Sequence, residues 1–302
     1  MALYLTNIAQ MHARNSFTNI TGQLNTSMQR LTSGMRINSA KDDPAGLQIS
    51  NRLNSEILGL SQASRNVSDG IALFQTAEGA LDEVTTMLQR IRTLAVQSSN
   101  GTLSDADRDA INQEVGQLSD EINRIAKTTK FGGSTIFNGD GNTPSLKNAN
   151  GSIVIQVGPH AGDSIEVDMS KGMLLDDMAK AANLDAKKDT GFVTNADGGR
   201  FDVSTQENAE NVLSFIDSFL SHTNSTRSYF GAIENRLDSI NRQNSTMHMN
   251  LADAKSRIAD TDFAQEVSNF AALQVKQQVS MQIMVMAGRA NQNLILQLLQ
   301  GI

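Results

Sequence analysis

Apolar side chains recur along residues 44–99 with the spacing of one long, packed helix. From Leu53 onward an apolar residue occupies every seventh position, a repeat typical of helices that run along one another in a bundle or coiled coil. The repeat comprises Leu53, Leu60, Val67, Phe74, Leu81, Leu88 and Ala95, with Ile57, Ile71, Val84 and Ile91 as a second stripe. Pro44 suits the first turn of such a helix, which would extend about 80 Å at roughly 1.5 Å per residue.

Two further stretches predict helices that complete a bundle. Asn100-Gly101 predicts a turn, and Ser104 with Asp107 predicts the capping box of a second helix. The apolar face of that helix consists of Ile111, Val115, Leu118, Ile122 and Ile125. Ser204 with Glu207 predicts the cap of a third, long helix. Its apolar stripe consists of Val212, Ile216, Phe219, Phe230, Ile233, Leu237, Ile240, Met247, Leu251, Ala254 and Ile258, interrupted by the polar Thr223, Thr226 and Asn244. We expect the three helices to pack together.

The middle of the chain has a different character. Residues 131–203 hold 11 of the 22 glycines and two of the three prolines. Two β-rich runs, 153–157 and 165–167, are separated by Gly158-Pro159 and predict a hairpin. A short helix is expected near residues 174–182, and a second hairpin turn at Asp197-Gly198-Gly199.

Both ends of the chain are helical in pattern and almost free of charge. Residues 1–29 contain one charged side chain, and residues 267–302 contain two. Such helices are poor surface elements for a soluble monomer, so we expect them to pair with each other and with neighbouring subunits of a polymer. The side chains expected to pack there are Phe17, Ile20, Leu24, Leu31, Val275, Val279, Ile283, Leu294 and Leu298. The methionine-rich run 281–286 is expected to be coiled-coil core, the alternative being an adaptable binding surface.

Composition narrows the classes of function. The 302 residues carry a net charge of −7, four scattered histidines and no cysteine, which excludes disulfides and thiolate chemistry. The acidic balance argues against nucleic-acid binding, no apolar run reaches the roughly 18 residues of a membrane span, and no basic lead-in suggests a secretory signal. Aspartate pairs such as Asp176-Asp177 lack a third ligand at metal spacing, so we expect capping or solvent-facing roles. We expect no enzyme and no cofactor.

Several motifs then carry a resemblance to a known family. They are QRLTSGMRINSAKDDPAGLQISNRL at Gln29–Leu53, the helical stretch Ser61–Thr102, FGGSTIFNG at Phe131–Gly139, AKSRIADTDFAQEVSN at Ala254–Asn269, and the terminal LILQLLQ. In this order and spacing the sequence resembles bacterial flagellin over nearly its whole length. The stretch 140–200 matches the variable region of the family and is short.

The resemblance implies a mainly α fold, in which a long antiparallel helical bundle and coiled coil carries a small β-hairpin module in the middle. Residues 1–43 with 259–302 would form a terminal coiled-coil domain of the inner tube of a filament. Residues 44–139 with 201–258 would form the helical core domain of the outer tube, and residues 140–200 a short β-rich variable region packed on that core.

The implied function is that of a structural subunit that polymerises into the helical flagellar filament for motility. The resemblance also implies type III export to an extracellular filament. Its partners would be copies of itself, an export chaperone, the filament cap, hook–filament junction proteins and host immune receptors, with no nucleic acid and no membrane insertion. The alternative is a hook–filament junction protein, which shares the terminal plan. A third hypothesis, an enzyme or metal-binding domain in the middle, is disfavoured by the short 140–200 region, which lacks clustered histidine or glutamate.

Two groups of residues are singled out as candidate sites. The linker set is Arg36, Asn38, Lys41, Asp42 and Asp43. The simplest role of this set is a solvated link with Asp43 as N-cap, and the resemblance adds a connection between inner and outer tubes and recognition by plant immune receptors. The contact set is Gln89, Arg90, Leu94 and Glu114. By resemblance it is bound by an animal Toll-like receptor and packs on the next subunit, and we expect Arg90 and Leu94 to share an outward face.

Overall fold

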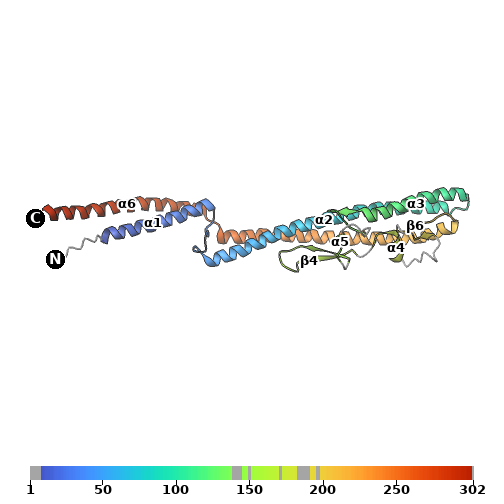
Figure 1. The fold of residues 1–302 in the computed structure, drawn as a ribbon, viewed down its shortest axis with the longest axis horizontal. Coiled ribbons are helices and arrows are strands. Elements are labelled where there is room, and N and C mark those ends of the chain that lie inside the picture. The colour runs from blue at the N-terminus through green and yellow to red at the C-terminus, as the bar shows by residue number, and fades with distance from the viewer. Residues whose placement is uncertain are drawn as a thin grey trace. The chain divides into compact units, whose positions relative to one another are not determined.

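The structure, a computed structural model, describes residues 8–137, 145–148, 151–169, 172–181, 191–194 and 198–300, with side chains up to Arg289. The chain is mainly α-helical with short antiparallel strand pairs, as predicted (Figure 1). It divides into two compact units, which are Met1–Ile57 with Met249–Ile302, and Leu58–His248.

The first unit is built on the pairing of the two terminal helices. Helix α1 (Ile8–Ser33) and helix α6 (Phe263–Gln300) run side by side in opposite directions (Figure 1). Gly34, with φ of 71°, ends α1 in the left-handed conformation that glycine adopts without strain. Met35 then forms a β-bridge to Asp260, so the two segments that border the helices are also joined.

The predicted bundle, most of which lies in the second unit, is formed by α2 (Pro44–Ser98), α3 (Asp105–Thr128) and α5 (Gln206–Ala259). All seven residues of the predicted heptad of α2 are at most 9% exposed. The rings of Phe74 and Phe230 pack with centroids 5.4 Å apart and join α2 to α5. The heptad stripe of α2 therefore faces its neighbours, as the sequence predicts.

The polar residues in the stripe of α5 are buried and have partners. The Thr223 hydroxyl donates to the carbonyl of Phe219 at 3.0 Å, and the Asn244 side chain donates to the carbonyl of Val157 at 2.8 Å. Because these buried polar groups have hydrogen-bond partners, their burial costs little free energy of folding. Met247, by contrast, is 41% exposed although it lies on the predicted stripe.

Helix starts follow the sequence with one shift. The Ser104 hydroxyl and the Asp107 carboxylate form the predicted capping box of α3. Helix α5 begins one residue later than predicted, because the hydroxyl of Thr205 accepts from the backbone amide of Asn208 at 3.1 Å. Ser204 instead donates its amide to the Asp202 side chain, so the predicted pairing of Ser204 with Glu207 is wrong.

The middle of the chain adds small β elements. β1 (Lys130–Phe131) pairs with β2 (Ser134–Thr135), β3 (Ser152–Gln156) with β4 (Ser164–Asp168), and β5 (Phe192–Val193) with β6 (Arg200–Phe201), all antiparallel. The β3–β4 hairpin and the short helix α4 (Leu175–Ala181) are as predicted. In the predicted turn, Asp197 lies outside the described residues, and Gly198 and Gly199 have φ of 121° and 85°.

Candidate assembly surfaces

Helix α6 turns a stripe of mixed polar and apolar residues toward α1. Glu266 is 9% exposed and Ser280 is 6% exposed, and a guanidinium nitrogen of Arg30 lies 3.8 Å from the Glu266 carboxylate. Gln277 donates to the hydroxyl of Thr21 at 3.4 Å. Phe270, Leu273 and Met284 lie on the same stripe and are partly buried, whereas most of the other described apolar side chains of α6 are exposed.

Apolar side chains of α6 are exposed on both sides of the stripe that faces α1. Val275 is 61% exposed, and Met281, Val285 and Met286 are between 48% and 61% exposed. Positions 281 and 285 fall on a different side of the helix from positions 275 and 286 at 100° per residue. Within this chain Met284 of the run 281–286 is partly buried, and the other five residues of the run are exposed. Exposed apolar side chains on more than one side of a helix are typical of an element that packs against further partners.

An open apolar groove follows one side of the α1–α6 pair. It encloses about 590 Å³ and is lined by Ala9, His12, Ala13, Ser16, Ile20, Val275, Lys276, Val279, Ser280 and Ile283. Val279 and Ile283 are 48% and 49% exposed, so these predicted packing residues lie at the edge of the pair.

The other predicted packing residues are placed as follows. Phe17, Ile20, Leu24 and Leu31 of α1 are partly buried. The side chains of Leu294 and Leu298 lie outside the described ones.

The linker residues form a compact, hydrogen-bonded turn. Arg36 binds the end of α5 through its amide to the Ala259 carbonyl at 2.7 Å and its guanidinium to the Ile258 carbonyl at 2.5 Å. Asp42 accepts from the Asn38 amide at 3.1 Å and from the amide and hydroxyl of Ser39. These hydrogen bonds, led by the Ser39 hydroxyl, lower the pKa of Asp42.

The N-terminus of α2 is capped as predicted. Asp43 accepts from the amide of Gly46 at 2.9 Å, and Pro44 follows at the first helical position. Asn38 donates its side-chain amide to the carbonyl of Met35 at 2.8 Å, and Lys41 is exposed. The linker is therefore an ordered turn with a basic side chain on its surface.

Two helices of the bundle present Arg90 and Glu114 together. The Arg90 guanidinium donates to one carboxylate oxygen of Glu114 at 2.7 and 2.9 Å, and both side chains are about half exposed. Gln89 is exposed beside them. An exposed pair of this kind contributes about 0–1 kcal/mol to folding, so stability alone gives little reason for it.

Leu94 departs from the prediction. It is 3% exposed and belongs to the core of the bundle, so the expected outward orientation is wrong. Helix α2 packs against both α3 and α5, as the pairs Arg90–Glu114 and Arg92–Asp217 indicate, and the buried arc is wider than one heptad stripe. Leu94 therefore lies beneath the exposed face of Arg90.

Two buried polar residues that organise the bundle were not anticipated. Arg108 donates to the carbonyls of Ser98, Asn100 and Leu103, and so caps the end of α2 from α3. Asn123 donates to the carbonyl of Gly199 at 2.8 Å and accepts from the amide of Leu175. Arg108 falls in line with the predicted apolar face of α3, which is a sequence signal for its role, whereas Asn123 lies beside that face.

Neither a cluster of metal-binding residues nor a membrane-spanning helix is found in the part of the chain that the structure describes. No group of three or more histidine, aspartate or glutamate residues gathers there at metal-binding distance. Among the described helices, none is long and apolar enough to cross a membrane. Asp176 and Asp177 instead pair with Lys180 at 3.1 and 3.7 Å, and Asp262 accepts from the amide of Ala264 near the start of α6.

Comparison with protein families and with known proteins gives matches that cover both helical ends of the chain. The family model of the bacterial flagellin N-terminal helical region matches residues 5–142, and that of the C-terminal helical region matches residues 213–299. The chain is 35% identical to polar flagellin F of Vibrio parahaemolyticus, over 97% of this chain and 98% of that protein. It is 38% identical to a flagellin of Halalkalibacterium halodurans over the same shares of the two chains.

A solved structure supports the fold. A protein of Vibrio parahaemolyticus, provisionally described as a flagellar hook-associated protein, is 18% identical and aligns with a TM-score of 0.54 over 72% of this chain and all of that one. The matches define a structural protein of the flagellum. The chain belongs to the bacterial flagellin family, and its function is that of a filament subunit.

Proposed function

We propose that neighbouring copies of the chain cover the exposed apolar sides of α6 when the filament forms. The observation that carries this proposal is the half-exposure of valine, isoleucine and methionine on more than one side of α6. One partner helix can cover only one stripe of another helix. The remaining stripes need further partners, and a helical polymer provides the same partners for every subunit.

The domain assignment follows from this proposal. Residues 1–43 with 259–302 would form the inner tube, where the apolar groove between α1 and α6 is filled. Residues 44–139 with 201–258 would form the outer tube, whose core closes within each chain. Residues 140–200 would be the short variable region on its surface.

Gln89, Arg90 and Glu114 are proposed as a lateral contact between subunits and as the face that immune receptors bind. Two observations support this proposal. The side chains are exposed, and the ion pair with Glu114 holds the Arg90 guanidinium in one position. Leu94 would act from beneath by fixing this part of α2. Arg90→Ala should weaken both receptor signalling by the monomer and the heat stability of filaments. Loss of signalling with fully stable filaments would contradict a shared surface.

The remaining elements of the proposal concern the path of the subunit. It would be exported through the flagellar type III apparatus, held by an export chaperone at its C-terminal helix, and joined to cap and junction proteins in an extracellular filament. The linker residues Arg36, Asn38, Lys41, Asp42 and Asp43 would connect the two tubes and be the segment that plant receptors recognise. The role of the whole subunit would be structural, without catalysis.

Polymerisation with protease mapping tests the central proposal. Purified full-length chain, added to short filament seeds, should form helical tubes that negative-stain imaging detects. Trypsin should cleave at Lys276 and Arg289 in the monomer and be excluded from both in the filament, while Lys180 on α4 serves as a control that remains accessible. Equal cleavage of Lys276 in both states would contradict the covering of α6.

A further inference from the structure

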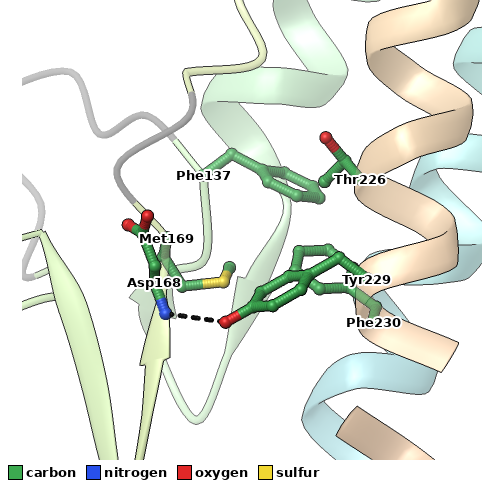
Figure 2. A pocket seen from close by; sticks show the side chains of 6 residues that line it. All are labelled: Phe137, Asp168, Met169, Thr226, Tyr229 and Phe230. Carbon is green, nitrogen blue, oxygen red and sulfur yellow. Dashed lines mark hydrogen bonds between the residues drawn. The ribbon is translucent and has the colours of Figure 1, made fainter. Parts of the chain in front are cut away.

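A small, mainly apolar cavity lies in the second unit. It has a volume of about 120 Å³ and is lined by Phe137, Asp168, Met169, Thr226, Tyr229 and Phe230 (Figure 2). Three lining residues come from successive turns of α5, one follows β2, and two stand at the end of β4. The cavity therefore lies where the hairpin and the β2 loop meet the long helix.

Buried apolar side chains form much of the lining of this cavity. Phe137, Met169 and Phe230 are each at most 3% exposed, and the ring of Phe74 packs at a tilt against that of Phe230, with centroids 5.4 Å apart. The hydroxyl of Thr226 donates to the carbonyl of His222 at 3.0 Å, which occupies its proton within the helix. An engineered apolar cavity of roughly 150 Å³ in another protein stays dry and binds benzene. The cavity here is of similar volume, and it is partly open because Asp168 and Tyr229 in its lining are exposed.

Tyr229 contributes a phenolic hydroxyl to the cavity. Its ring is 37% exposed, and its hydroxyl accepts a hydrogen bond from the backbone amide of Asp168 at 3.2 Å (Figure 2). A phenolic hydroxyl that accepts one hydrogen bond still has a proton to donate. The Asp168 carboxylate, close by and exposed, disfavours an anion.

We propose that this cavity is a binding site for a small, neutral aromatic molecule with a single oxygen that accepts a hydrogen bond from Tyr229. Phenol has this chemistry, benzene lacks the oxygen, and benzoate carries the wrong charge. The site is formed within one chain, so its occupation does not depend on polymerisation. Because so few ligand atoms contribute, we expect a dissociation constant on the order of 1 mM for phenol.

Methyl NMR of the full-length monomer tests the proposal. The methyl signal of Met169, assigned by its loss in Met169→Leu, should shift saturably with phenol and with benzene, with phenol several-fold tighter, and should not move with benzoate. Tyr229→Phe should remove the advantage of phenol and leave benzene binding unchanged.

Two variants that fill the cavity from opposite walls complete the test. Thr226→Leu and Met169→Phe should each abolish binding of both ligands, followed in Met169→Phe by ligand-detected saturation transfer. Unfolding curves identify which variant is folded, and either one suffices. No saturable shift in the unchanged protein, benzoate binding equal to phenol, or undiminished binding by a folded filled variant would overturn the proposal.

Discussion

The substitution Val279→Asp separates the stability of the isolated chain from that of the filament. Val279 is 48% exposed at the edge of the groove between α1 and α6. In the monomer an aspartate at this position can reach water, and valine and aspartate have similar helix propensities. We therefore expect the free energy of unfolding of the monomer to change by no more than about 0.5–1 kcal/mol.

The filament should respond far more strongly. Fully burying a valine side chain contributes about 1.5–3 kcal/mol, so covering the exposed half of Val279 adds roughly 1 kcal/mol per subunit. An unpaired carboxylate in an apolar contact costs several kcal/mol more. A total of about 4 kcal/mol corresponds to a rise on the order of 1,000-fold in the concentration needed for assembly.

The assay compares two measurements on each variant. Urea unfolding of the monomer gives its stability, and sedimentation of seeded mixtures gives the critical concentration for assembly. Val279→Ile keeps the apolar surface and is the matched control. Filaments of Val279→Asp with an unchanged critical concentration would refute the covering of this groove. A monomer weakened by several kcal/mol would show instead that Val279 is buried in the isolated chain.

The remaining predictions concern the bundle. In calorimetry, Leu94→Ala should lower the free energy of unfolding by about 2–5 kcal/mol, because a buried side chain is lost. Gln89→Ala, on the exposed face, is the control and should change the free energy of unfolding by less than about 0.5 kcal/mol. Ser104→Ala should cost about 1 kcal/mol in urea denaturation through loss of the cap of α3. Burial and the nearby Glu78 raise the pKa of Glu234, and a raised carboxyl pKa contributes stability at low pH that is lost as the pH rises through it. Glu234→Gln should therefore raise the Tm at pH 7, and the difference should vanish well below the ordinary pKa of 4.5.

The bundle was predictable because its partners lie in the same chain. The heptad from Leu53 to Ala95 and the aliphatic positions of α3 are buried against helices that the sequence itself supplies. The positions of the hydrophobic repeat in these helices are therefore the positions that face the interior of the bundle. Leu94 was misplaced because a heptad describes one seam, whereas α2 has two neighbours and buries a wider arc.

The terminal helices were harder to predict in detail. Apolar residues surround α6, so its sequence does not define which stripe faces α1, and the buried stripe proves to include Glu266 and Ser280. The cavity beside Tyr229 had no sequence signal at all, since it depends on the meeting of β2, β4 and α5. Features of that kind arise from tertiary packing and not from local pattern.

The apolar sides of α6 have a consequence for how the stability of a filament depends on salt and temperature. Dissolved salt weakens attraction between charges beyond about 8 Å at physiological ionic strength, but contacts between uncharged side chains give it little to screen. The proposed subunit contacts through Val275, Val279 and Met286 should therefore have nearly the same free energy in fresh water and in brine. Cooling should loosen them instead, because the gain from burying apolar surface falls as the temperature drops.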